Sequence, residues 1–182
     1  MWRKLVQSTY RRKSRFYRYL EEDMVGVTLQ PEQQWAMFVG ALALEWTHIR
    51  ELLDIWVEAI HKHGGAERIQ AHLPANLDRA LDYLSEALKC GLVSEKMRED
   101  GKRLISEIHH LKNFRHNLIH GRTKVERGRV ICENRRARGA ALLAITTTYT
   151  VAQQFRHYDR TRKLVGDLRD FLVAENEVQS SR

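Results

Sequence analysis

Hydrophobic side chains recur at three- and four-residue steps over four long segments of the chain, which predicts four amphipathic helices. The first segment has the strongest hydrophobic stripe, and this stripe includes Trp35, Trp46 and Trp56. Large side chains on a single face are expected to form the spine of the core. The chain has only two prolines, which favours long uninterrupted helices. The predicted helices cover residues 31–62, 74–90, 94–119 and 150–175.

Residues that favour helix ends lie at several of these limits. Gly91 and Gly121 follow the second and third predicted helices, where glycine commonly ends a helix. The side chain of Ser94 is suited to cap the start of the third helix. Thr150 and Gln153 have the spacing of a capping box, in which two side chains satisfy each other's backbone N–H groups. The fourth helix is therefore expected to begin directly after Thr150.

The hydrophobic period changes after the third predicted helix. Residues 122–126 and 129–133 alternate loosely between apolar and polar, which predicts a β-hairpin. Residues 145–149 have high β-propensity and can add a third strand. The expected fold is therefore mainly α: a bundle of four to five helices with a small hairpin or three-stranded insertion at about residues 122–149.

Positive charge is concentrated at the start of the chain. The first 20 residues hold seven Lys or Arg and no acid, which accounts for nearly all of the net charge of +8. Aromatic residues are interleaved with these cations, so rings can stack on bases while cations neutralise phosphates. We expect a polyanion as partner, with RNA ahead of DNA and of an anionic membrane. In the alternative reading, these aromatics pack on the bundle. The cations expected to contact RNA in this arm are Arg11, Arg12, Lys13 and Arg15.

The chain is expected to contain one folded domain, at residues 31–176, between a basic arm at 1–30 and a tail at 177–182. No apolar run has the length of a membrane span, so no membrane is predicted as a partner. Cys90 and Cys132 are too few for a disulfide framework or a cysteine-based zinc site, which fits a cytoplasmic location.

Candidate chemistry is concentrated at the end of the third predicted helix. Arg115 falls in the middle of the apolar arc of this helix, and burying its guanidinium unpaired would cost several kcal/mol. Arg115 is therefore expected either at the edge of the core with a partner, or in a cleft that uses its charge. Five residues later lies His120, whose side chain exchanges its proton near neutral pH.

The sequence Arg115-His116-Asn117-Leu118-Ile119-His120 resembles the Rx4-6H motif of HEPN domains. The resemblance extends over about residues 30–176, and its specific part is the motif. It implies a helical bundle, usually dimeric, in a family where many members are metal-independent endoribonucleases. Other members have lost activity and bind nucleotides or partner proteins. In the active members, a two-fold dimer brings two Arg/His pairs to one cleft.

By this resemblance, Arg115 and His120 are the catalytic residues of an endoribonuclease that leaves 2′,3′-cyclic phosphate ends. Such an enzyme is expected to act as a toxin or defence effector, as a homodimer, with an antitoxin or other protein as a further partner. Residues i and i+5 lie about 140° apart on an ideal helix, so the two side chains share a face only if the helix end is distorted. Supporting roles are predicted for His116, Asn117, Glu45 and Arg50, and RNA contacts for Arg122, Lys124, Arg127 and Arg129.

Other interpretations of the same residues were weighed. The same basic cleft can belong to a catalytically silent HEPN-like module that binds a nucleotide, RNA or a protein. The interpretation as a helical DNA-binding regulator has less support, because the sequence shows no clear turn followed by a recognition helix. His116 and His120 have a spacing that suits two metal ligands, but no acidic or Cys ligand pattern accompanies them, so no metal or cofactor is predicted. Asn117 is expected at the surface, as a capping or solvated residue.

Overall fold

The computed structural model describes residues 30–62, 69, 72–91, 95–126, 129–138 and 141–180. Several predictions lie outside these residues. They include the proposed cap at Ser94, the proposed RNA contact at Arg127, and the four cations of the basic arm, Arg11, Arg12, Lys13 and Arg15.

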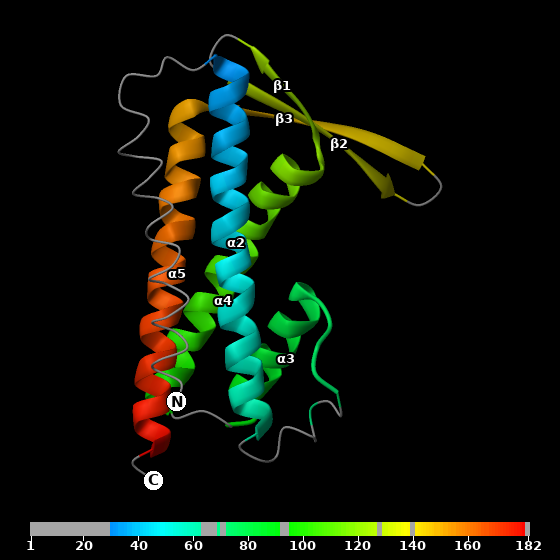
Figure 1. Cartoon of the computed structure of the whole chain (residues 1–182). Coiled ribbons are helices and arrows are strands. Elements are labelled where there is room, and N and C mark those ends of the chain that lie inside the picture. Colours follow the sequence, from blue (N-terminus) through cyan, green and yellow to red (C-terminus); the bar gives the residue numbers. More distant parts are fainter. Residues whose placement is uncertain are drawn as a thin grey trace.

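The described residues form four helices and a three-stranded antiparallel sheet, so the mainly α fold with a small β insertion is confirmed. The helices are α2 (Pro31–Lys62), α3 (Leu77–Lys89), α4 (Glu95–His120) and α5 (Val151–Ser180). The strands are β1 (Arg122–Glu126), β2 (Arg129–Arg138) and β3 (Ala141–Thr150). Three long helices, α2, α4 and α5, pack along one another, and the shorter α3 packs against α2 and α4 (Figure 1). The sheet lies beyond the end of α4, at one end of the bundle (Figure 1).

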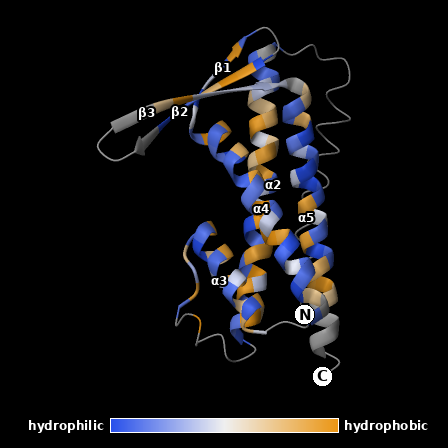
Figure 2. Cartoon of the chain, turned by 180° about the vertical axis from the view of Figure 1, so that it is seen from behind, coloured by the Kyte–Doolittle hydropathy of each residue, from blue (hydrophilic) through white to orange (hydrophobic). Residues whose placement is uncertain are grey.

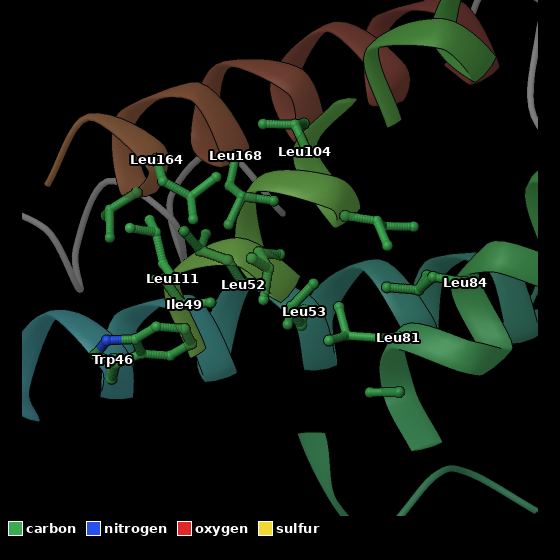
Figure 3. Close-up of a cluster of buried hydrophobic side chains, with 14 of the residues drawn as sticks. Trp46, Ile49, Leu52, Leu53, Leu81, Leu84, Leu104, Leu111, Leu164 and Leu168 are labelled. Atoms are coloured by element: carbon green, nitrogen blue, oxygen red, sulfur yellow. The ribbon is translucent and has the colours of Figure 1, made fainter. Parts of the chain in front are cut away.

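The core is formed by the apolar stripes of the four helices. Trp46, Ile49 and Leu53 of α2 face leucines from α4 and α5 (Figure 3). Each fully buried leucine contributes about 1.5–3 kcal/mol relative to an exposed one. Gly101 of α4 allows close approach, since a Cβ there would lie 2.9 Å from Leu88 Cδ2. The predicted core spine of α2 is therefore confirmed.

Local capping interactions decide two of the helix starts. Helix α3 begins at Leu77 rather than at residue 74, because the side chain of Asn76 accepts a hydrogen bond from the backbone N–H of Arg79 at 2.9 Å. The capping box at α5 is confirmed. The N–H of Thr150 donates to Gln153 Oε1 at 2.8 Å, and the N–H of Gln153 donates to Thr150 Oγ1 at 3.2 Å.

Of the predicted C-terminal ends of α3 and α5, one is confirmed and the other is wrong. Gly91 ends the α3 segment with a φ of +72°, as predicted for a glycine in that place. Helix α5 continues to Ser180, so the prediction that it ends at residue 175 before a tail was wrong. Residues 175–180 contain no glycine or proline, and nothing local breaks the helix there.

The sheet has the order β1-β2-β3 with antiparallel neighbours. Arg122 of β1 lies opposite Glu133 of β2, and Glu133 lies opposite Thr146 of β3. Strand β2 extends to Arg138, beyond the predicted end at residue 133. The reason is that β3 pairs with β2 as far as the Arg138–Ala141 partners, after the short β1 has ended. The outer part of the β2–β3 hairpin projects away from the helices in both views (Figures 1 and 2).

Candidate functional site

The last turns of α4 form one wall of a pocket of about 610 Å³. The opposite wall is the start of α3, where Asn76 caps the helix. The pocket forms because the N-terminus of α3, which is distant from the motif in the sequence, packs opposite it in space. Its lining residues are Asn76, Leu77 and Asp78 from the start of α3, and Lys112, Asn113, Arg115 and His116 from α4.

Arg115 is half-buried and lines this pocket. Its guanidinium carbon lies 6.0 Å from the ring centroid of Trp46 on α2, which is the geometry of a cation–π contact. Its Nε atom is buried and has no hydrogen-bond partner among the described residues. Arg115 was expected either at the core edge with a partner or in a cleft. In the structure it has an aromatic partner at the core edge and also lines a pocket. The guanidinium keeps N–H donors available for an anion.

His116 links Arg115 to His120. The rings of His116 and His120 lie with their centroids 5.0 Å apart and their planes at 51°, and both side chains are exposed. Helix α4 stays regular to His120, so Arg115 and His120 do not share a face. His116 lines the pocket together with Arg115, whereas His120 is not among the lining residues. The pocket edge therefore holds the guanidinium of Arg115 and the imidazole of His116, and the ring of His120 lies next to His116 outside the lining.

The end of α4 is joined to the sheet through Asn117. Its Nδ2 donates to the hydroxyl of Tyr149 on β3 at 2.9 Å, and its Oδ1 accepts from Asn134 Nδ2 on β2 at 3.0 Å. The N–H of Gly121 donates to the Asn117 carbonyl at 3.1 Å. The expectation of a surface role for Asn117 was therefore wrong. Its side chain faces the sheet, because Tyr149 on β3 and Asn134 on β2 supply polar partners. Without Asn117, these hydrogen bonds of Tyr149 and Asn134 would be lost.

Helix α5 packs behind the motif through His157. The ring of His157 stacks on Phe114, the residue before Arg115, with 3.9 Å between centroids and 13° between planes. Burial lowers the pKa of His157, and the positive charges of Arg160 and His110 lower it further. His157, Asn134 and Tyr149 were not predicted from the sequence as site residues. Only Tyr149 had a local signal, its place in a strand-forming run, because the contacts of all three cross between distant segments.

Glu45 and Arg50 of α2 do not reach the pocket. Glu45 is buried, and its Oε2 lies 3.3 Å from His48 Nδ1 on the same helix. Arg50 pairs with Asp54 at 2.7 Å and donates to the carbonyl of Pro74 at 3.4 Å. Within the described contacts neither residue touches Arg115, His116 or His120. Arg50 instead helps to hold the segment that leads into α3.

The predicted RNA contacts on the sheet are exposed. Arg122 and Lys124 lie on β1, which follows the end of α4, and Arg129 lies on β2 opposite Glu126, at the far end of β1. Lys124 is paired with Glu126. Across the pocket, Lys112 donates to Asp78 at 2.8 Å, and this hydrogen bond holds the pKa of Asp78 below its usual value. The pocket rim and the nearby strand β1 therefore carry more positive than negative groups.

Metal ligands do not gather in the described part of the chain, where no group of three or more His, Cys, Asp or Glu could hold an ion. Cys90 is exposed, while Cys132 is buried in the sheet. Burial raises the pKa of the Cys132 thiol to about 11, so this thiol is not a nucleophile near neutral pH. Among the described helices, none combines the length and the apolar character needed to cross a membrane.

Comparison of the chain with protein-family models, with curated proteins and with solved structures found no match.

Proposed function

We propose that the chain is a HEPN-like, metal-independent endoribonuclease that acts at the pocket between α3 and α4. The observation that supports this most directly is the arrangement of Arg115, His116 and His120. The guanidinium of Arg115 and the imidazole of His116 line the pocket, and the ring of His120 lies 5.0 Å from that of His116, centroid to centroid. RNA cleavage needs a group that holds the phosphate and two groups that move protons. The role as a toxin or defence effector, with an antitoxin as a partner, rests on the family resemblance.

The reaction uses the 2′-hydroxyl of RNA as its nucleophile. One imidazole removes the 2′ proton, and the 2′ oxygen attacks phosphorus. The bond to the 5′ oxygen breaks as the other imidazole, in its protonated form, donates a proton to that oxygen. Arg115 holds the non-bridging oxygens more strongly as their charge grows. The products are a 2′,3′-cyclic phosphate and a 5′-hydroxyl.

His116 removes a difficulty of the single-histidine motif. One histidine cannot easily act as base and acid in the same step, and the family resemblance implies that a homodimer supplies the second. In this chain, His116 and His120 are adjacent on one helix face. A single protomer therefore has both proton-transfer groups.

RNA cleavage in excess EDTA tests this proposal. We expect the wild-type protein to produce cyclic phosphate ends. We expect His120→Ala, His116→Ala and Arg115→Gln each to lower the rate by about 10²–10⁴-fold, the size of a lost acid–base or charge-stabilising group. His110→Ala is the matched control, since His110 is exposed on the same helix and does not line the pocket. End-group analysis and single-turnover rates provide the measurement.

A rate that is equal in the motif variants and the wild type would contradict this assignment. So would loss of activity in EDTA that returns with added metal. Folding of each variant is checked by circular dichroism and thermal unfolding, so that lost activity is not mistaken for lost structure.

The second candidate is a binding module without catalysis, and the surroundings of His120 favour it. Catalytic histidines are usually oriented by a hydrogen bond to one ring nitrogen. Among the described residues, no group hydrogen-bonds to the ring nitrogens of His120, and its ring contact is with His116. Tight RNA or nucleotide binding without cleavage by wild-type protein would support this function. Tight binding of duplex DNA would instead point to a regulator.

A further inference from the structure

Among the described residues, strand β3 forms one edge of the sheet. In the described part of the chain, the order is β1-β2-β3, so β3 has a neighbouring strand on one side only. Strand β3 has 10 residues, whereas β1, at the opposite edge, has 5. The longer edge therefore presents the longer row of backbone N–H and C=O groups to its surroundings.

The two edges differ sharply in charge. Charged residues make up 30% of the chain, and β1 carries Arg122, Lys124 and Glu126 in five residues. Strand β3, with the sequence ALLAITTTYT, contains no charged residue and no proline. Natural proteins protect a free edge with charge, proline, a bulge or a very short strand. Strand β1 has two of these protections, its charges and its short length, but β3 has neither.

In the described part of the chain, no third strand accompanies the outer half of the β2–β3 hairpin. Beyond the end of β1, residues 134–138 of β2 pair only with residues 141–145 of β3. This two-stranded arm projects from the helices (Figures 1 and 2). Ala144, Ile145 and Thr146 of β3 are consecutive and all exposed, and Ile145 has 43% of its surface exposed, whereas Asn134 of β2, opposite Ile145, is buried against Asn117 of α4. A two-stranded ribbon is only marginally stable in water without further packing.

We propose that β3 is a dimerisation edge, and that it pairs antiparallel with β3 of a second copy of this chain. An antiparallel edge is self-complementary about a two-fold axis, so the same edge on two copies satisfies both. The partner must tolerate an uncharged, apolar edge, and β3 itself has that character. Helix α5 begins at Val151, directly after β3, so a partner strand has more room beside the other end of β3. The pairing is therefore centred on residues 141–146. The result is a continuous six-stranded sheet.

This arrangement separates the two candidate sites. The two β1 strands would be at least five strand spacings apart, or at least about 24 Å, because pairing at residues 141–146 also displaces them in opposite directions along the strands. Each His120 lies two residues before its β1 strand, so the two histidines would not meet at one phosphate. Each protomer would keep its own pocket. The inference does not depend on the proposed RNA cleavage, because it concerns association, which is measured without RNA.

Sedimentation equilibrium over about 1–500 μM tests the inference, since a small interface is expected to be weak. Ile145→Lys and Thr146→Lys add a charge to adjacent positions of the β3 edge. We expect each to weaken dimerisation about tenfold or more, because two-fold symmetry places the new charge in the interface twice. Thr146 lies opposite Glu133, so a lysine there has an opposite charge across the strand pair and preserves the fold.

The matched control is Thr123→Lys, which adds the same charge to an exposed threonine of the β1 edge and should leave the dissociation constant unchanged. In a second measurement, amide hydrogen exchange of residues 141–150 should slow with rising protein concentration in wild type but not in Ile145→Lys. A wild-type protein that stays monomeric throughout would overturn the inference. A dimer that all three lysine variants leave equally strong would overturn it as well, since its interface would lie elsewhere.

Discussion

At the scale of single residues, Gly121 leaves no room for a side chain. It joins the end of α4 to β1, and its N–H donates to the Asn117 carbonyl. A Cβ at this position would lie 2.4 Å from that carbonyl oxygen and 3.0 Å from Asn134 Oδ1. The first of these atoms belongs to the backbone and cannot rotate away. Glycine is therefore required by close approach as well as by its preference for helix ends.

We expect Gly121→Ala to lower the free energy of unfolding by about 1–3 kcal/mol, the usual size of local strain. Gly40→Ala is the matched control. Gly40 lies inside α2 and is exposed, and an added Cβ would meet nothing within 4 Å. Alanine there should stabilise the protein by about 0.5–1 kcal/mol, because it favours the helix. Urea denaturation of both variants measures the two changes, and equal effects would contradict the close-approach argument.

At the scale of elements, helix α4 is fixed near its C-terminal end by contacts with two neighbouring elements. The sheet holds it through Asn117, and α5 holds it through the stack of His157 on Phe114. The Nδ1 atom of His157 is buried without a hydrogen-bond partner among the described residues, and burial lowers the pKa of this side chain. A protonated His157 would therefore disfavour the packing of α5 against α4.

This packing predicts a pH dependence of stability. The pKa of His157 is lower in the folded state than its ordinary value of 6.5, so the unfolded chain binds the proton first as the pH falls. The contribution of His157 is fully present above about pH 6.5, declines as the pH falls below it, and is lost once the pH has passed the lowered folded pKa.

His157→Phe keeps a ring stacked on Phe114 and removes the titrating group. Its free energy of unfolding should fall less between pH 7.5 and pH 5 than that of the wild type, as measured by urea denaturation at each pH. Parallel pH profiles for the two proteins would show that His157 does not carry this dependence.

At the scale of the whole molecule, the charge distribution predicts how RNA would bind. Arg122 and Arg129 are exposed at opposite ends of the β1–β2 strand pair, on a chain with a net charge of +8. If both contact phosphates, the double variant Arg122→Gln/Arg129→Gln should lower the slope of log affinity against log salt by about 1.4, which is about 0.7 for each contact with single-stranded RNA.

The control for this measurement is Lys102→Gln/Lys163→Gln, which removes two exposed charges from the early part of α4 and from α5. Binding is followed by fluorescence anisotropy at several salt concentrations. An identical reduction of slope in both double variants would indicate a diffuse effect of net charge rather than contacts at the sheet.

The sequence by itself determined the element types and most of their limits. Helix α2 was predicted with its observed bounds, and the capping box at Thr150 was recognised, because a helical period and a cap depend on residues within a few positions of each other. The hairpin after Gly121 was found from its change of period. The start of α3 was missed because it depends on a local competition, in which Asn76 caps the helix.

Only the tertiary structure decided which side chains share a site. Asn117 turns inward because Tyr149, 32 residues away in sequence, lies beside it in space. Arg115 faces a pocket because the start of α3 stands opposite, and His116 rather than His120 joins it there. Strand β2 is long because β3 pairs with it. None of these facts is encoded in a local period. The first two depend on where a segment distant in sequence packs, and the third depends on how far the next strand pairs.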